Sequence, residues 1–470
     1  MTLSCSDILQ VKHIRSEEFE GSQQTFPGVS IDSRKVLHGS LFVALRGEQL
    51  DGHNFLSNAV KAGAKAVVVE NKWAEMNSSF LKAIPVAKLV VEDSVRALGE
   101  LARNYRRLFR IPVLAVGGSN GKTTTKEMIK TLLETKYEVL ATEGNLNNHI
   151  GVPLTLFRLE NRHKIAVVEI GTNHPGEIEY LSSILEPTHA LITNIGREHL
   201  EFFHSLEGVA KAELELLEWL KTNRRDDGVV FLNKDDASLS RRSRTLHHTI
   251  SFGFSRKEVD VRGTDLSVNE NGAAQFTIEA EKKPPINISL PVPGLHNALN
   301  ALAAAAVGIS FNVPAAKIQH ALATFSAASK RMETVCVNGI TILNDTYNSN
   351  PDSVRAALET LGAMKTSGKK IAVLADMLEL GEMSEREHRS VAALVKSSGA
   401  EYLLTYGRLS KATHDASTVQ FKAHYEQKNI LSEYLAELLI GGDTVLIKGS
   451  REMKMEDVVT FLKERFSRAA

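Results

Sequence analysis

Short apolar runs alternate with stretches of helical spacing along most of this chain. Residues 165–170, 189–195 and 229–233 are apolar over most of their length, as strands covered on both faces of a parallel sheet must be. Helical stretches separate such runs. The pattern therefore predicts an α/β protein built on parallel sheets.

The first predicted domain covers residues 1–108. It is expected to be a small α/β domain, with strands within 39–45 and 64–70 and helices at 56–62 and 94–108. It carries no nucleotide-binding loop of its own. A length of 470 residues leaves room for two further domains, at about 150 residues each.

The second and third predicted domains cover residues 109–326 and 327–470. In the second, residues 249–293 alternate apolar and polar positions, which predicts antiparallel strands attached to the parallel sheet, and 296–307 form an Ala-rich helix. The third is expected to be a Rossmann-like, doubly wound domain without a glycine-rich dinucleotide loop. Its predicted strands lie at 340–344, 370–375, 401–405 and 444–448.

A glycine loop opens the second domain. Residues 117–125 read Gly-Gly-Ser-Asn-Gly-Lys-Thr-Thr-Thr and separate a strand-like run at 111–116 from a helical stretch at 126–133. Strand, glycine loop, Lys-Thr and helix together bind nucleotide phosphates, through inward N–H groups, a lysine and a helix N-terminus. Val116 occupies the first glycine place of the general motif, so this loop is one residue shorter. A plain glycine-rich turn is the alternative, but it does not explain three successive threonines, which are poor helix formers. The candidate phosphate-binding residues are Gly117, Ser119, Asn120, Gly121, Lys122, Thr123 and Thr124.

Composition narrows the possible partners. Lys and Arg together number 56, as do Asp and Glu, so no overall field attracts nucleic acid. The two cysteines, Cys5 and Cys336, have no metal-type spacing and predict no disulfide framework. No apolar run approaches the roughly 20 residues that span a bilayer, and no signal-peptide pattern is evident. We expect no nucleic-acid binding, no membrane insertion and a cytoplasmic location.

Polar residues follow the strands of the second domain, where open α/β sheets form their sites. Glu169 is a candidate Mg²⁺ ligand, with a capping carboxylate as the alternative. His199 is a candidate second cation ligand or proton acceptor, with a structural histidine as the alternative. Lys211, taken alone, is a helix-surface lysine. Three asparagines offer amides to a polar ligand or simply form turns: Asn145, Asn147 and Asn148.

Three strand ends of the third domain carry charged and amide groups. Residues 345–351, 376–382 and 448–454 each follow a predicted strand. Together they could bind a zwitterion, with carboxylates holding its amine and Arg451 or Lys454 holding its carboxylate. Each loop by itself is only suggestive.

Taken together, these segments resemble the Mur ligases, the ATP-dependent amide-forming enzymes of peptidoglycan precursor synthesis. The short phosphate loop, which departs from the general motif, is the form that this family uses. The resemblance covers nearly the whole chain. It is carried by residues 32–34, 41–45 and 51–53, by the loop Gly-Lys-Thr-Thr, by Glu169, His199 and Lys211, by residues 296–300 and 331–333, and by the three strand ends above.

The resemblance implies a role for each matching residue. Lys122 and the loop amides would hold the ATP phosphates. Thr123 and Glu169 would ligate one Mg²⁺, and His199 a second that it shares with Glu169. Lys211 would align with the lysine that many members carbamylate to make an anion bridging to that second metal. The adenine would contact His296 and Asn297, while Arg331 and Asp345 would close over ATP and Ser33 and Arg34 would hold the UDP end of the substrate.

Within the family, residues 345–351 and 375–381 resemble the member that joins D-alanyl-D-alanine to UDP-N-acetylmuramoyl-tripeptide. The Asp-Asn-Pro-Arg motif of the ligase that adds a diamino acid is absent. The implied partners are these two substrates, the implied intermediate is an acyl phosphate, and the implied state is a monomer. Further candidate substrate-binding residues are Asn145, Asn147, Asn148, Tyr347, Asn348, Asp376, Glu379, Arg451 and Lys454.

Three alternatives remain at this point. The first is another Mur-type ligase. The second is a ligase like folylpolyglutamate synthase, which shares the phosphate loop and metal residues but usually lacks the separate UDP-binding domain. The third is a nucleotide-dependent regulator, which would explain the loop but not the charged strand ends of residues 327–470.

Overall fold

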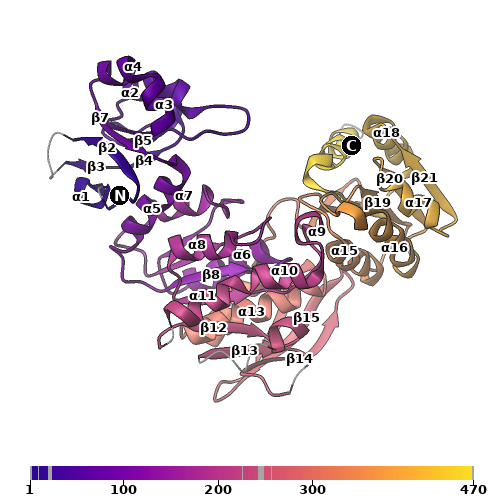
Figure 1. Cartoon of the computed structure of the whole chain (residues 1–470). Coiled ribbons are helices and arrows are strands. Elements are labelled where there is room, and N and C mark those ends of the chain that lie inside the picture. Colours follow the sequence, from indigo (N-terminus) through magenta and orange to yellow (C-terminus); the bar gives the residue numbers. More distant parts are fainter. Residues whose placement is uncertain are drawn as a thin grey trace. The chain divides into compact units, whose positions relative to one another are not determined.

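The computed structural model describes residues 3–8, 10–19, 24–224, 226–241, 248–255 and 257–467. The chain forms two compact units, whose elements are drawn in Figure 1. The first unit contains Met1–Ala115, Tyr137–Gly171 and Glu177–Thr188, and the second contains Val116–Lys136, Thr172–Gly176 and His189–Ala470.

The first unit contains a five-stranded sheet in the order β2-β7-β6-β5-β4. Strands β4 to β7 run parallel, and β2 joins as an antiparallel edge. The strands and helices predicted for residues 39–108 are confirmed, with shorter bounds. The elements are β1 Leu3–Ser4, α1 Cys5–Ile8, β2 Ile14–Glu18, β3 Thr25–Phe26, β4 Val29–Ser30, β5 Leu41–Val43, α2 Leu56–Lys61, β6 Ala66–Glu70, α3 Asn71–Met76, α4 Ser78–Ala83, β7 Ala87–Val91 and α5 Ser94–Arg106.

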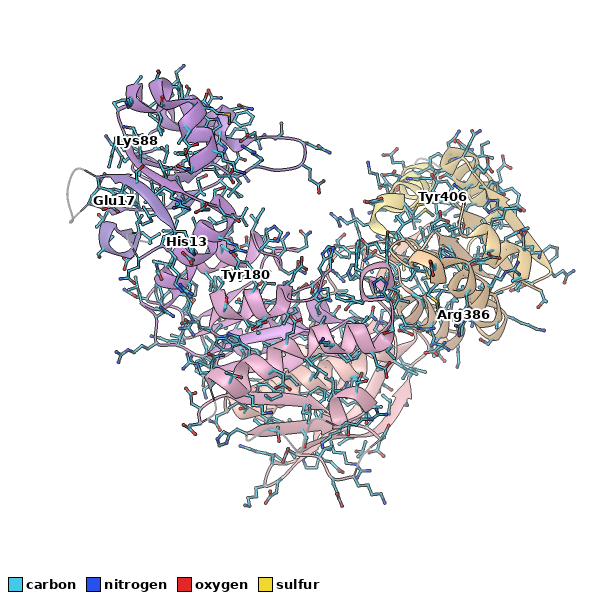
Figure 2. All side chains as sticks on the ribbon, in the orientation of Figure 1. His13, Glu17, Lys88, Tyr180, Arg386 and Tyr406 are labelled. Carbon is cyan, nitrogen blue, oxygen red and sulfur yellow. The ribbon has the colours of Figure 1, made fainter. Side chains whose placement is uncertain are left out.

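Further elements of the first unit pack against α5. They are β9 Val139–Ala141, α7 Gly151–Leu156, β10 Ile165–Glu169 and α8 Glu177–Leu185, and β10 pairs in parallel with β9. Helix α8 approaches α5 at Gly99, where an added Cβ would lie 2.7 Å from Ile184 and 2.8 Å from the hydroxyl of Tyr180, which Figure 2 labels. The Arg106 guanidinium donates to the carbonyls of Leu185 and Glu186, at 2.8 and 2.9 Å. These contacts fix α8 and the residues after it against α5.

The second unit contains neighbouring sheet strands in the order β16-β15-β14-β13-β12-β11-β8. Strand β8, Val113–Gly117, contributes residues to both units. The prediction of antiparallel strands over 249–293 is correct only from β14 onward. Strand β13 pairs in parallel with β12 and with β14, whereas β14, β15 and β16 are antiparallel. Its last three residues are buried, as expected of a strand that extends a covered parallel sheet. The elements are α6 Lys122–Glu134, β11 His189–Ile192, α9 Leu200–Phe203, α10 Leu206–Glu213, α11 Glu215–Asn223, β12 Val229–Asn233, α12 Ala237–Ser240, β13 Thr249–Gly253, β14 Val261–Val268, β15 Ala273–Ala280, β16 Ile286–Pro293, α13 His296–Ser310 and α14 Ala315–Ala323.

A six-stranded sheet completes the second unit, in the order β17-β18-β22-β19-β20-β21. All its pairings are parallel except that of the edge strand β17 with β18. Its elements are β17 Glu333–Val337, β18 Ile340–Asp345, α15 Pro351–Ala363, β19 Lys370–Ala375, α16 Ser384–Ser397, β20 Tyr402–Tyr406, α17 Lys411–Ala416, β21 Phe421–Tyr425, α18 Lys428–Leu438, β22 Thr444–Lys448 and α19 Glu456–Ser467.

Alternate residues of this sheet pack into two separate cores. Along β19, Ala372 and Leu374 contact the core that includes α15 and α16, while Ile371 and Val373 contact the core that includes α18 and α19. The two faces follow from the two-residue repeat of a strand. Helices thus cover both faces, and Figure 1 shows them around β19, β20 and β21. The predicted doubly wound sheet is confirmed.

Candidate active site at the phosphate loop

Two glycines of the phosphate loop have backbone conformations that favour glycine. Gly118 has φ +111°, and an added Cβ would lie 2.3 Å from Thr193 Oγ1. Gly121 has φ +81° and is the N-cap of α6, and a Cβ there would lie 2.5 Å from Asn300 Oδ1. Left-handed backbone and close neighbours together exclude larger residues at both positions.

The loop is fastened to the end of the neighbouring strand β11. Ser119 N donates to Asn194 O at 2.9 Å, and Gly196 N donates to Ser119 Oγ at 2.8 Å. Asn120 N donates to Asn194 Oδ1 at 3.1 Å, and Thr193 Oγ1 donates to Asn120 O at 2.7 Å. Because these bonds hold the turn between β8 and α6, the loop is preformed before any ligand arrives.

Lys122 begins α6 and lies within the loop. Its Nζ donates to the Gly118 carbonyl, which leaves the ammonium folded back over the turn. It also lies 3.4 Å from Glu198 Oε2, and the Thr123 side chain next to it is buried. A lysine, a helix N-terminus and inward amides at a glycine turn are the parts of a phosphate site.

A buried carboxylate contacts the loop from α10. Glu213 is fully buried, and its Oε2 accepts a hydrogen bond from Gly118 N at 2.7 Å. Burial raises the pKa of Glu213 to about 8; the charge of Lys122 opposes this increase, and Glu198 adds to it. One buried carboxylate oxygen of Glu213 and one of Glu198 have no hydrogen-bond partner in the part of the chain that the structure describes.

Lys211 and His199, the two predicted metal-site residues that follow the loop, differ in exposure and in their contacts. Lys211 is exposed, although it is on the same helix as Glu213. His199 has φ 47° and its Nδ1 lies 2.6 Å from Glu379 Oε2. The hydrogen bond with His199 lowers the pKa of Glu379. His199 and Glu379 are therefore paired, and both were predicted site residues.

Within the first unit, Glu169 ends β10 and is held by a predicted neighbour. Asn147 Nδ2 donates to Glu169 Oε1 at 2.8 Å, while the buried Oε2 has no partner among the described residues. Asn148 Oδ1 accepts from the amides of Ile150 and Gly151, so it caps the start of α7, and Asn145 is exposed. Two of the three asparagines thus have local structural bonds.

The predicted UDP contacts lie in a short 3-10 helix, Ser33–Lys35. Asp32 caps this helix by accepting from Arg34 N at 3.0 Å and also pairs with the Arg34 guanidinium, at 2.9 Å. The side chain of Arg34 is 86% exposed, so it is accessible to a ligand.

The predicted adenine contacts differ in accessibility. Asn297 is buried; its Nδ2 donates to Pro293 O at 2.7 Å, and its Oδ1 accepts from Asn300 Nδ2 at 3.1 Å. Through Asn300, which lies against Gly121, Asn297 supports the loop. His296, at the start of α13, is exposed.

Several predicted residues of the third domain meet around one tyrosine. The guanidinium carbon of Arg331 lies 3.7 Å from the centre of the Tyr347 ring, and that of Arg451 lies 4.9 Å from it. Asp345 Oδ2 is 2.6 Å from Nζ of the buried Lys448, which also donates to the Asn348 carbonyl at 2.8 Å. Two arginines and a tyrosine ring form a cationic, planar surface, which suits a carboxylate or phosphate.

Two other residues of this set are separate from that cluster in their contacts. Asp376 is buried, and its Oδ1 accepts from Ser410 N at 2.7 Å, which makes it a support for the following loop. Lys454 is exposed, has φ 47°, and its carbonyl accepts from Lys428 Nζ at 2.9 Å.

Polar bonds join the loop region to the start of α15 and to α16. Arg197 binds Asp352 through its backbone N, at 2.7 Å, and through Nη2, at 2.6 Å, and it binds Glu387 through Nη1 at 2.9 Å. Asn350 Nδ2 donates to Asn120 Oδ1 of the loop itself at 2.9 Å. Burial raises the pKa of Asp352, but the hydrogen bonds and the charge of Arg197 lower it by more, so the pKa lies below its ordinary value.

Over the described ranges, no helix is long and apolar enough to cross a membrane. Those same residues contain no group of three or more His, Cys, Asp or Glu side chains arranged to hold a metal ion. Cys336 is a free, exposed thiol.

Known proteins match almost the whole chain. Residues 25–106 match the description "Mur ligase family, catalytic domain", residues 116–308 "Mur ligase middle domain" and residues 330–451 "Mur ligase, glutamate ligase domain". This chain belongs to the Mur ligase family. The UDP-N-acetylmuramoyl-tripeptide--D-alanyl-D-alanine ligase of Bacillus subtilis is 35% identical over 94% of each chain.

Two solved structures are similar to this Mur ligase over nearly their full length. MurF from Acinetobacter baumannii has a TM-score of 0.87 and 29% identity, covering 99% of each chain. MurF from Thermotoga maritima, solved in complex with ADP, has a TM-score of 0.82 and 27% identity, covering 94% of this chain and 98% of that one. The family resemblance and the three-domain α/β fold class predicted from sequence are confirmed.

Sequence reasoning did not identify three residues of this Mur ligase as parts of the site. Glu213 and Glu198 contact Gly118 and Lys122 of the loop, and Arg197 binds Asp352 and Glu387. Glu213 carried a readable signal, because it falls in the apolar stripe of its helix. Arg197 carried none, since its partners lie more than 150 positions away.

Proposed function

We propose that this Mur ligase joins D-alanyl-D-alanine to UDP-N-acetylmuramoyl-tripeptide, using ATP to activate the carboxyl group through an acyl phosphate. The match to a relative that bears this name, over 94% of both chains, carries the proposal. The preformed phosphate loop supports the use of ATP, as does the ADP complex of the Thermotoga neighbour.

In this proposal the loop holds the triphosphate. The N-terminal turn of α6, at Lys122 to Thr124, would face the phosphate oxygens, and Lys122 would leave the Gly118 carbonyl to neutralise the transferred group. The amides of Gly118, Ser119 and Asn120 are bonded within the protein and hold the turn. Asn297 supports Gly121 through Asn300, and His296 is left exposed for the adenine. Arg331 and Asp345 complete the ATP site.

The reaction then has two steps. A carboxylate oxygen of the tripeptide attacks the γ-phosphorus, the bond to the β–γ bridging oxygen breaks, and ADP leaves. The amine of D-alanyl-D-alanine attacks the acyl carbon, a tetrahedral intermediate forms, and it expels phosphate while the nitrogen loses a proton. Since acyl phosphates hydrolyse, the contacts of Arg197 with Asp352 and Glu387 support a role in closing the site against water.

Glu169 carries carboxylate oxygens of the kind that bind magnesium ions. Glu169 offers a buried oxygen without a partner among the described residues, and Asn147 orients the other oxygen of the same carboxylate. Carboxylate and hydroxyl oxygens are the ligands that Mg²⁺ prefers. By the family resemblance, one ion is assigned to Glu169 and Thr123, and a second to His199 and Glu169. The ions would neutralise charge on the phosphates.

The two carboxyl-bearing substrates need separate anchors. Ser33 and Arg34 would hold the UDP end, and the high exposure of Arg34 supports this. The dipeptide would meet Tyr347 and Arg451, with Arg451 on its carboxylate. Further contacts would come from Asn145, Asn147, Asn148, Asn348, Asp376, Glu379 and Lys454.

The proposal includes a cytoplasmic location and a monomeric state. Gel filtration with light scattering tests the second directly. Folylpolyglutamate synthase, the rival with a shared loop, is disfavoured because residues 25–106 match a Mur ligase domain.

One assay separates the alternatives. Phosphate release from ATP is measured with UDP-N-acetylmuramoyl-tripeptide, with and without D-alanyl-D-alanine, and with folate substrates in parallel. Release that needs both cell-wall substrates, together with the pentapeptide product, supports the proposal. Phosphate release only with the folate substrates, or no release with either set of substrates, would contradict it.

A further inference from the structure

We propose that Glu213 is a positioning residue of the phosphate loop, and that its own carboxyl group makes carbamylation of Lys211 unnecessary in this chain. This inference rests on the proposed function, because it concerns how the loop binds a nucleotide in complex with Mg²⁺. It changes which residue of α10 supplies the anion.

The helix pattern decides which side chain of α10 faces the loop. Val209, Ala212 and Glu213 are buried, and the stripe continues into α11 with Leu216 and Leu217. These positions follow the three- and four-residue spacing of one helix face. Lys211 lies two positions before Glu213, about 200° around the helix, and is exposed. A carbamate on Lys211 would therefore point away from Gly118.

Glu213 contacts the peptide unit on which the loop turns. Its Oε2 accepts from Gly118 N at 2.7 Å, while the carbonyl of the same residue accepts from Lys122 Nζ. Gly118 has φ +111°, a conformation that glycine adopts without strain but does not fix by itself, so the bond from its amide to Glu213 restrains the turn. Glu213 thereby fixes the loop at its sharpest point.

The second oxygen of Glu213 indicates more than a structural role. Glu213 Oε1 and Glu198 Oε1 are both buried without a hydrogen-bond partner in the described part of the chain, and Lys122 lies 3.4 Å from Glu198 Oε2. Two neighbouring buried carboxyl groups beside a site for an anionic nucleotide are favoured as anions only when positive charge accompanies the ligand. The pair should reject free nucleotide and accept the Mg²⁺ complex.

The test is a comparison of two affinities. Calorimetry on the full chain gives Kd for ADP with excess Mg²⁺ and for ADP with EDTA, in wild type, Glu213→Gln and the matched control Glu207→Gln. Glu207 is an exposed glutamate of the same helix. We expect Glu213→Gln to weaken Mg-ADP binding by about tenfold or more and to reduce the preference for Mg-ADP over free ADP. The control should match wild type.

Equal weakening of both nucleotides in Glu213→Gln would reduce Glu213 to a purely structural residue, and unchanged Mg-ADP affinity would also overturn the proposal. Glu213→Asp guards against misfolding, because it keeps the charge; it should retain the Mg²⁺ preference with weaker binding overall. The native mass of wild type should show no added carboxyl group, and Lys211→Ala should bind Mg-ADP normally without bicarbonate. A carboxylated Lys211, or bicarbonate rescue of Lys211→Ala, would contradict the inference.

These results are independent of the substrate assignment. If wild type binds Mg-ADP but never ligates the cell-wall substrates, the proposed function fails while the affinities still test Glu213. If ligation occurs and the Mg²⁺ preference ignores Glu213, only this inference fails.

Discussion

Arg197 joins the loop region to α15 and α16, and its removal should weaken that contact measurably. Arg197→Ala deletes the bonds to Asp352 and to the buried Glu387, at 2.6 and 2.9 Å. A hydrogen bond to a charged group contributes about 1.5–3 kcal/mol, and less where solvent reaches it. The Arg197 side chain is 29% exposed, so we expect a net loss of roughly 2 kcal/mol, which includes leaving Glu387 unpaired.

Amide hydrogen exchange measures this loss where it occurs. The amides of Arg197 and Glu201 donate to Asp352 and to the Glu379 carbonyl, at 2.7 and 3.0 Å, so they exchange only when these contacts open. A loss of about 2 kcal/mol should speed their exchange roughly 30-fold. The control is Arg389→Ala, which removes an exposed ion pair on α16 and should change these amides by less than about threefold. Unchanged exchange in Arg197→Ala would refute the assigned role.

Three further predictions follow from the same contacts. Glu169→Gln should raise the Mg²⁺ concentration for half-maximal phosphate release by about tenfold or more, measured by metal titration; an unchanged titration would remove Glu169 as a ligand. Tyr347→Ala should raise KM for the dipeptide and KM for ATP, each by about threefold to tenfold, because the ring contacts both Arg451 and Arg331; steady-state kinetics with both KM values unchanged would contradict the assigned role. The pKa of Asp352 is lower in the folded protein than in the unfolded chain. The contribution of Asp352 to folding stability is therefore fully present above its unfolded-state pKa and is lost as pH falls through its folded-state pKa. The stability difference between wild type and Arg197→Ala should therefore shrink below about pH 4, and a constant difference would contradict this.

Much of the fold could be predicted because buried parallel strands are continuous apolar runs. Strand β19 was predicted with the bounds observed, and β12 likewise. Edge strands β17 and β21 have no fully buried residue, so they lack that signal and were not predicted. Strand β13 was assigned the wrong direction, because its short alternation resembles an antiparallel strand while its pairing depends on distant neighbours.

The phosphate loop was predictable because glycine, lysine and threonine must follow one another there. Its supports were not, because Asn194 and Asn350 reach it only after the chain folds. Glu213 stands between these cases. A glutamate among the apolar positions of an amphipathic helix is unusual and can be recognised from the sequence. The prediction nevertheless assigned the metal-binding role to Lys211, which lies on the exposed face.

The central claim is that the loop at Gly117–Thr125 positions ATP so that its γ-phosphoryl group is transferred to a carboxyl oxygen. A tripeptide substrate labelled with heavy oxygen in its terminal carboxyl group tests this most directly. With wild type, ADP, pentapeptide and phosphate should form in equal amounts, with one labelled oxygen in each phosphate. The variant Lys122→Ala should bind little Mg-ATP and release no phosphate. Pentapeptide formed with the label retained entirely in the peptide would contradict the account.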